Sequence, residues 1–480
     1  MRTTNLPHEL VEVSKLLKCY KLLVKGAPGT GKTLLALGIC EFLNQGGTAL
    51  YISTRVTPEE LYATYPWVGK LIPPKNVLDA TESRYRPPED LAVAFKYVEK
   101  PAFIQAMYEL CSQKPKPDSV IVDSLEALKE NLQVSREDYS LESSMIEISR
   151  TTGTNLILVS ETDYITPVDY LVDGIVKQVK IDKNVFLRVT EIQKLRGINV
   201  NCPRYLFTLE GGQYKVLPPQ RSTLDDLIKS EKEKRFEPIK NMEGKISTGI
   251  KYLDTITGGG YSYGSVNLIE VNRGVGEAYD YFYLPTIYNY VLSGGRVLII
   301  PPSGISAQVM RGMIEPVVGE ENLLNCVKIV DFQLSGKTDA EKEEPWKVIL
   351  EGNNLSDDYQ ILYEETKALR RGQKSVLVVI STDTLESAYG WQSKGRRDIS
   401  YLIPRGSIEA KQTGNTALCL AKYGQERIID YINHISDEHF NIINVEGTVL
   451  IHGIFPYFPA MYPALERSEN GLKVDLTPIV

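Results

Sequence analysis

The sequence predicts an α/β fold that occurs twice in tandem, each copy with a mainly parallel central sheet. Three observations lead to this fold class. Short apolar segments alternate with longer helical stretches, a glycine-rich loop joins the first such segment to a helix, and a similar order returns in the second half of the 480 residues. Strands that alternate with helices form parallel sheets covered by helices on both faces.

The strand at 21–24 leads into a glycine-rich loop with the spacing of a phosphate-binding loop. Backbone N–H groups of such a loop surround a polyphosphate, and the dipole of the following helix adds to the attraction. We expect Lys32 to reach the β- and γ-phosphates and the Thr33 hydroxyl to bind Mg²⁺. A turn with a chance Lys-Thr pair is the alternative, but both flanks fit the phosphate loop. The predicted nucleotide-binding residues are Gly26, Ala27, Pro28, Gly29, Thr30, Gly31, Lys32, Thr33 and Leu34.

The rest of the first half follows the same alternation. Further strands are predicted at 48–53, 119–123 and 155–161, with helices at 34–45, 58–64, 101–113 and 139–152. Beyond residue 174 the pattern changes to β segments at 175–181, 185–194 and 205–209. We expect these three to be antiparallel strands that extend the sheet.

The charge-dense stretch 222–245 is interpreted as a linker, which divides the chain into domains at 1–221 and 246–480. The second half repeats the spacing of the first: a strand at 266–271, a helical stretch, Gly294-Gly295 and a strand at 296–300. The corresponding glycines of the first half are Gly46-Gly47. This similarity predicts an internal duplication.

Two acidic residues follow strands at the sheet edge where ligands bind in parallel α/β folds. Asp123 ends one strand and is predicted to hold Mg²⁺. Its alternative role is a helix N-cap. Glu161 ends the next strand and is predicted to sense or position the γ-phosphate; a loop carboxylate without a role is the alternative.

These motifs resemble the RecA-type ATPase domain of the KaiC group. The resemblance rests on the phosphate loop, the Asp123 strand, Ser160-Glu161, Asp173-Gly174-Ile175 and above all Lys194-Leu195-Arg196-Gly197. The second half is similar to the opening of that domain, at Ser247-Thr248-Gly249-Ile250 and Gly258-Gly259-Gly260. The stretch from Tyr51 to Leu61, with Tyr65-Pro66-Trp67, is more similar to the GvpD branch, the archaeal gas-vesicle regulators.

The resemblance implies ATP and Mg²⁺ as ligands and self-association in a ring, usually a hexamer, or a dimer. It also implies that Lys194 and Arg196 reach the γ-phosphate of a neighbouring subunit, as an arginine finger in trans does. A basic β-turn without that role is the alternative for these residues.

The chain departs from the KaiC pattern at the residue pair before Thr57-Pro58. ATPases of that group carry two glutamates there, which polarise the attacking water, and this chain has Arg55 and Val56. A guanidinium cannot accept a proton, but it can bind the γ-phosphate. We expect tight ATP binding with slow or absent hydrolysis, so the chain is a weak ATPase at most. Glu59 and Glu60 are the alternative bases.

The second half has lost the residues of a nucleotide site. Glu277 and Ala278 replace the lysine and hydroxyl of the loop, and Ser381-Thr382 stands where the Mg²⁺-binding Asp is expected. This half is predicted to be a pseudo-ATPase that recognises a protein partner. Its helix at 279–290 carries six aromatic residues, for which packing is favoured over a ligand platform.

The net charge, the cysteines and the apolar runs of the sequence disfavour several classes of protein. The net charge of −7 disfavours general nucleic-acid binding, and six scattered cysteines without metal spacing are typical of a cytoplasmic protein. No apolar run is long enough to span a membrane. The sequence favours an ATP-dependent regulatory switch whose partner, by the GvpD resemblance, is a transcription factor. A DNA-dependent RecA-type ATPase and an autophosphorylating kinase are the alternatives.

Overall fold

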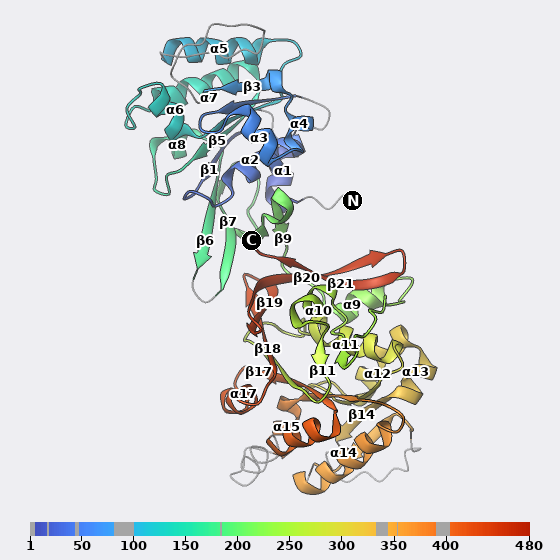
Figure 1. Cartoon of the computed structure of the whole chain (residues 1–480). Helices are drawn as coiled ribbons and strands as arrows, with labels where there is room; N and C mark the ends of the chain where they lie inside the picture. Colours follow the sequence, from blue (N-terminus) through green and yellow to red (C-terminus); the bar gives the residue numbers. More distant parts are fainter. Residues whose placement is uncertain are drawn as a thin grey trace. The chain divides into compact units, whose positions relative to one another are not determined.

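The computed structural model divides into two compact units, one formed by Met1–Pro218 with Ile479–Val480 and the other by Pro219–Pro478 (Figure 1). The structure describes residues 5–16, 19–43, 48–80, 100–182, 185–332, 344–352, 354–389 and 404–480. The predicted turn Gly46-Gly47 lies outside these residues.

The first unit is built on a nine-stranded sheet in the order β3-β2-β4-β5-β1-β6-β7-β8-β9. The strands are β1 (Lys21–Lys25), β2 (Ala49–Ser53), β3 (Val77–Asp79), β4 (Ser119–Asp123), β5 (Asn155–Ser160), β6 (Gly174–Asp182), β7 (Phe186–Leu195), β8 (Arg204–Thr208) and β9 (Lys215–Leu217). All strands from β3 to β6 are parallel, and the last three are antiparallel. The predicted antiparallel pairing after residue 174 is confirmed for β6 with β7 and for β7 with β8, while the parallel pairing of β6 with β1 was not predicted. The helical crossover from β5 brings β6 alongside β1 in the same direction.

Helices cover both faces of this sheet because its strand residues alternate between two cores. Leu22 and Val24 face one core with α1 and α2, and Leu23 faces the other with α5, α6 and α7. The helices of the unit are α1 (His8–Leu16), α2 (Lys32–Leu43), α3 (Pro58–Thr64), α4 (Val68–Leu71), α5 (Lys100–Ser112), α6 (Leu125–Asn131), α7 (Ser140–Thr152) and α8 (Pro167–Leu171), with 3₁₀ turns η1 (Pro74–Asn76) and η2 (Glu210–Gly212).

The second unit repeats this topology. Its ten-stranded sheet runs β15-β14-β13-β16-β17-β12-β18-β19-β20-β21, which matches the first sheet with β15 added at one edge. Its strands are parallel as far as β18 and antiparallel beyond it. The fold class is thus confirmed as two tandem α/β domains with mainly parallel sheets.

The elements of the second unit have the following bounds. The strands of its large sheet are β12 (Val266–Val271), β13 (Arg296–Ile300), β14 (Val327–Phe332), β15 (Lys347–Leu350), β16 (Val376–Ser381), β17 (Thr416–Lys422), β18 (Glu438–Val445), β19 (Thr448–Phe455), β20 (Phe458–Ser468) and β21 (Gly471–Pro478), and β10 (Lys245–Ile246) pairs with β11 (Tyr261–Ser262). The helices are α9 (Leu224–Ser230), α10 (Lys251–Thr257), α11 (Asp280–Leu292), α12 (Ala307–Val318), α13 (Glu320–Cys326), α14 (Leu355–Leu369), α15 (Thr382–Tyr389) and α17 (Glu426–Asn433), with a further helix at 404–413.

Helix α11 lies in the largest apolar core of the second unit, and the aromatic side chains of the stretch 279–290 are buried there. Tyr279 and Tyr283 stack with ring centroids 5.8 Å apart. Packing is therefore the role of these aromatic residues. Among the described residues, no helix combines the length and apolar character that a membrane span requires.

Part of the stretch interpreted as a linker belongs to the second unit. Helix α9 buries Leu224 and Ile228 in the core of that unit. The Asp280 carboxylate accepts hydrogen bonds from the backbone N–H groups of Leu224 and Asp225, each at 3.0 Å. Four-residue spacing of the apolar side chains gives this charged helix one buried stripe.

The second unit also buries an acidic side chain, Glu438, at the start of β18. Burial raises the pKa of this carboxyl to about 8; Lys245 opposes the rise, and Asp437 and Asp254 add to it. The folded unit therefore keeps a proton up to about pH 8, whereas the unfolded chain releases it near pH 4.5, the ordinary pKa of a glutamate side chain.

We expect the free energy of unfolding of the second unit to fall as pH rises from 4.5 to 8, because the native state binds the extra proton. The slope for one proton is at most about 1.4 kcal/mol per pH unit. The variant Glu438→Gln should show a flatter pH profile in urea unfolding at pH 5, 6.5 and 8. Glu469→Gln, at an exposed position, is the matched control. Equal slopes for wild type and Glu438→Gln would contradict this assignment.

Candidate functional site

The phosphate loop leaves the middle of the first sheet, because β1 lies between β5 and β6. Residues 26–31 join β1 to α2. Gly26 has φ +148°, and a Cβ atom there would lie 2.4 Å from the Gln178 carbonyl oxygen. Gly31 has φ +93°. Both positions require glycine, since the backbone turns in a region that other residues avoid.

Lys32 opens α2 and is folded back over the loop. Its Nζ donates a hydrogen bond to the Ala27 carbonyl oxygen at 2.9 Å. Burial lowers the pKa of Lys32, and the negative charges of Glu161, Asp123 and Glu126 oppose that shift. The ammonium group is thus already positioned at the loop, where a bound phosphate would replace the carbonyl as its partner.

Thr33 and Asp123, which are 90 positions apart in the sequence, meet at this loop. The Thr33 Oγ1 donates to Asp123 Oδ2 at 2.6 Å, and the Tyr51 hydroxyl donates to the same oxygen at 3.0 Å. Burial raises the pKa of Asp123, while these two hydrogen bonds and Lys32 lower it. A hydroxyl and a carboxylate in contact are the two protein ligands that Mg²⁺ has in phosphate-loop sites.

The donor set fits Mg²⁺ bound together with a nucleotide. Within the described part of the chain, no group of three or more His, Cys, Asp or Glu side chains is suited to hold a metal ion by itself. Phosphate oxygens and water would therefore supply the remaining ligands, as Mg²⁺ prefers.

Arg55 and Glu161 are brought together at the same edge of the sheet. The Arg55 Nη2 lies 2.8 Å from Glu161 Oε2. Arg55 follows β2 and Glu161 follows β5, with β4 between those strands. The guanidinium therefore neutralises the carboxylate that was predicted to sense the γ-phosphate.

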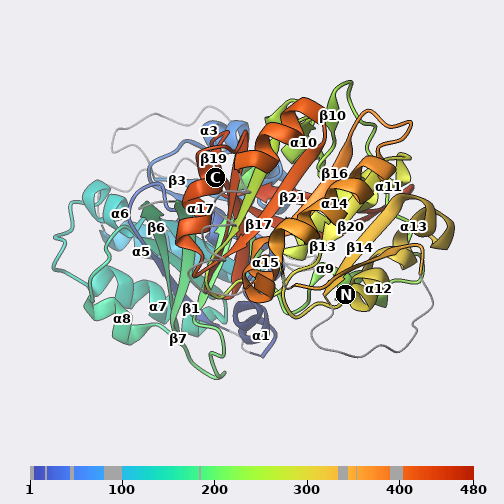
Figure 2. The same ribbon diagram turned by 90° about the horizontal axis from the view of Figure 1, so that it is seen from below.

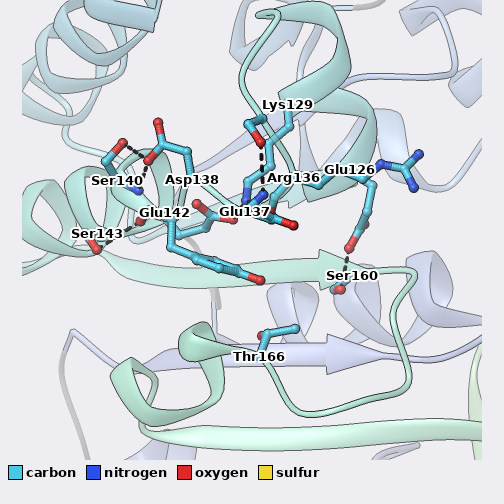
Figure 3. Close-up of polar contacts among 12 residues, drawn as sticks. Glu126, Lys129, Arg136, Glu137, Asp138, Ser140, Glu142, Ser143, Ser160 and Thr166 are labelled. Atoms are coloured by element: carbon cyan, nitrogen blue, oxygen red, sulfur yellow. Dashed lines mark hydrogen bonds and ion pairs between the residues drawn. The ribbon is translucent and has the colours of Figure 1, made fainter.

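Glu126 is a site residue that the sequence analysis missed. Its Oε1 accepts a hydrogen bond from Ser160 Oγ at 2.6 Å (Figure 3), and its Oε2 accepts one from the Glu161 N–H at 2.9 Å. Glu126 thus holds the end of β5 and the backbone of Glu161. Its place three residues after Asp123, in the first turn of a helix, was the signal available in the sequence.

Two cations of the β6–β7 hairpin also lie beside the loop and were missed. Arg188 Nη1 donates to the Gly29 carbonyl oxygen at 3.1 Å. Lys180 Nζ lies 3.0 Å from where a Cβ of Gly29 would stand. The two residues face each other in the β6–β7 register, a pairing that only the folded hairpin reveals. They add positive charge next to the place predicted for phosphates.

Arg196 lies beyond the amino end of β1, whereas Lys194 pairs with Ile175, the neighbour of Leu23 in the middle of that strand. Lys194 Nζ donates to the carbonyl oxygens of Asp169 and Val172 at 2.9 and 2.7 Å, and Arg196 lies 3.4 Å from Asp173. Asp173 and Leu195 flank the amino end of β1, whereas the phosphate loop follows its carboxyl end. A five-residue strand separates these ends by about 13 Å. Arg196 is therefore not part of the site formed within one chain, and the Lys194 ammonium is engaged by backbone carbonyls.

The corresponding loop of the second unit is occupied by its own side chains. Lys422 Nζ lies 2.8 Å from Asp383 and 5.2 Å from the ring centroid of Tyr279. Asp383 also accepts a hydrogen bond from Ser381, which stands at the position equivalent to Asp123. The ion pair of Lys422 with Asp383, next to the ring of Tyr279, thus stands where the first unit has the pair of Thr33 with Asp123.

Comparison with known proteins shows which family this chain resembles. The model of the GvpD gas vesicle protein P-loop domain matches residues 18–194, and the model of GvpD basic region 2 matches residues 235–332. The chain is related to the GvpD gas vesicle proteins. Protein GvpD2 of Halobacterium salinarum is 24% identical over 473 residues, which cover 96% of this chain and 93% of the relative. Protein GvpD1 of the same organism is 23% identical over 96% of this chain and 94% of its own length.

These matches confirm the GvpD resemblance and extend it over both units. The match to the P-loop domain includes the phosphate loop, Asp123, Glu161 and Lys194. The stretch matched as a basic region carries eight Lys and Arg against ten Asp and Glu residues in this chain. It is therefore not basic here, and this stretch adds no electrostatic attraction for nucleic acid.

Proposed function

We propose that this chain is a nucleotide-controlled regulatory protein of the gas-vesicle system. Its first unit binds ATP·Mg²⁺ and holds it with slow or absent hydrolysis. The observation that carries the proposal is the 2.6 Å contact of Thr33 with Asp123 beside the lysine of a phosphate loop. The GvpD resemblance supports the connection with gas vesicles, since the matching family model describes the P-loop domain of a gas vesicle protein.

In this proposal the loop amides and Lys32 hold the β- and γ-phosphates, while Thr33 and Asp123 hold Mg²⁺. Bound Mg²⁺ would neutralise charge on the phosphate oxygens. Gly29 shapes the loop with its carbonyl bound by Arg188. Glu126 keeps Glu161 at the end of β5.

Slow hydrolysis follows from the side chains at the γ-phosphate end. Arg55 occupies a position where KaiC-type ATPases have a glutamate, and its ion pair with Glu161 engages the nearest carboxylate. Asp123 and Glu126 also accept hydrogen bonds from neighbouring groups. A general base typically raises the rate of such a reaction about 10²–10⁴-fold. A site without a free base is therefore expected to hydrolyse ATP slowly and to retain it.

We expect wild-type protein to bind ATP and to return it mostly intact in a single-turnover assay. Arg55→Glu supplies a proton acceptor and should raise the hydrolysis rate. Arg55→Gln is the matched variant, because it removes the guanidinium without adding a base and so measures what the release of Glu161 alone contributes. Fast hydrolysis by wild type that Lys32→Ala abolishes would refute the proposal of a slow switch.

The second unit is proposed to recognise a protein partner, for which the GvpD resemblance suggests a transcription factor. Self-association in a ring or dimer is proposed on the same grounds. The placement of Arg196 supports it, because this exposed cation lies too far from its own phosphate loop to contact the same nucleotide. Exchange of ATP for ADP would then change contacts between subunits and bias which surface is presented.

A further inference from the structure

The second unit contains an apolar cavity of about 190 Å³ between its sheet and the helices over one sheet face. Strands β13, β16 and β17 line one side of it, and α14, α15 and the helix at 404–413 line the other. Figure 2 shows α14 and α15 alongside these strands. Val378 and Ile380 point into it, whereas their neighbours Leu377 and Val379 face the opposite core.

The same sheet face is also covered by helices in the first unit. There α5, α6 and α7 form one continuous core with β1, β2, β4 and β5. Among the described residues, the equivalent face of the second unit carries three smaller clusters of buried residues around the cavity. The packing of this face thus differs between two copies of one fold.

The side chains on this sheet face can be compared position by position between the two units. Helix α7 ends at Thr152-Gly153 before β5, and the helix at 404–413 ends at Thr413-Gly414 before β17. With these ends aligned, large side chains of the first core correspond to small or polar ones at the cavity. The pairs are Met145 with Gly406, Ile146 with Ser407, Ile148 with Glu409, Leu156 with Ala417 and Leu158 with Cys419.

We propose that this cavity is a binding site for a compact, mostly apolar small molecule with one hydrogen-bond donor. Protein interiors are close-packed, and an empty apolar space of this size forfeits contacts along all its walls. An engineered apolar cavity of 150 Å³ binds benzene, so 190 Å³ suits a molecule of about six to ten non-hydrogen atoms.

One end of the cavity offers a hydrogen-bond acceptor for the donor group of such a ligand. The Glu409 carboxylate lies in the cavity wall and accepts a hydrogen bond from the Tyr359 hydroxyl at 2.5 Å. A few polar groups in an otherwise apolar site fix the orientation of a ligand. A hydroxyl or ring N–H directed at Glu409 meets this requirement.

Calorimetric unfolding of the full chain in the presence of indole tests the proposal. Indole should raise the Tm of the second unit in a dose-dependent way. The variants Ser407→Ile and Ala417→Leu restore the side chains of the first unit and should remove this response. Ile408→Leu, on the same helix at a position that is 58% exposed, should retain it. An equal response in wild type and the refilled variants would overturn the proposal.

Cys419 supplies a second readout that needs no substitution. Its thiol lines the cavity, and burial raises its pKa to about 12. Cys111 in the first unit is a matched control, because burial also raises its pKa to about 12. At an indole concentration ten times its Kd, alkylation of Cys419 by N-ethylmaleimide should slow about tenfold, with Cys111 unaffected. Unchanged alkylation of Cys419 would overturn the proposal, and neither assay depends on ATP binding.

Discussion

Replacement of Lys32 by alanine is expected to weaken ATP binding about 100-fold. The Lys32 ammonium lies at the phosphate loop, 2.9 Å from the Ala27 carbonyl oxygen. Its loss removes charge-assisted hydrogen bonds to phosphate worth about 1.5–3 kcal/mol, and 1.4 kcal/mol corresponds to tenfold in affinity. Titration with a fluorescent ATP analogue in the presence of Mg²⁺ measures the change.

Two further variants separate the specific role of Lys32 from general charge. Lys180→Ala removes a neighbouring cation beside Gly29 and should weaken binding much less. Lys32→Arg keeps the charge but presents a planar fork in place of a compact ammonium, so affinity should be restored only in part. Unchanged affinity in Lys32→Ala would show that the loop does not bind nucleotide through this residue.

The same variant tests the link between nucleotide and assembly. If ATP promotes self-association, light scattering should show a larger species for wild type with ATP than without it. Lys32→Ala should give one size in both conditions. A wild-type monomer in both conditions would remove the proposed trans role of Lys194 and Arg196.

The second large effect is expected on stability, at the buried ion pair beneath the phosphate loop. Lys25 Nζ lies 2.7 Å from Asp169 Oδ1 and also donates to the Tyr164 carbonyl oxygen at 2.6 Å. The Lys25 side chain is 2% exposed. Burial tends to raise the pKa of Asp169, but hydrogen bonds from Lys25 and Thr166 lower it overall. The carboxylate is therefore held in its charged form opposite the lysine.

Asp169→Asn should lower the free energy of unfolding of the first unit by about 3–5 kcal/mol, because Lys25 then keeps a buried charge without its counter-charge. The double variant Lys25→Met/Asp169→Leu should recover much of this loss, since an apolar pair replaces an ion pair at little cost. Urea unfolding of the three proteins measures the difference. A double variant as unstable as Asp169→Asn would show that hydrogen bonds to Tyr164 and Thr166, rather than charge balance, determine the stability.

Local sequence patterns predicted the strands and helices of the first half closely. The strand at 119–123 and the helix at 139–152 are examples, because apolar periodicity depends on near neighbours along the chain. The short edge strand β3 was not predicted, since three residues carry too little periodicity. The parallel pairing of β6 with β1 was not predicted, because strand direction depends on the crossover that precedes it and not on the strand's own residues.

In the candidate site, too, the residues that are neighbours in the sequence were predicted and those that the fold brings together were not. Gly26–Thr33 could be predicted because the loop is one continuous motif. Glu126, Lys180 and Arg188 could not, because they reach the loop from α6 and from the β6–β7 hairpin. The ion pair of Arg55 with Glu161 joins residues 106 positions apart, and no local pattern contains it.

The sequence by itself determined that this chain carries one intact phosphate loop, a duplicated α/β fold and a second copy without the loop's lysine. These properties are determined by residue identity at fixed spacing. Only the tertiary structure decided which charges face one another at the loop, that Arg196 lies away from it, and that the second copy contains an apolar cavity. The physical reason is that charge neutralisation and packing depend on distances between side chains, which the chain defines only when its strands are in register.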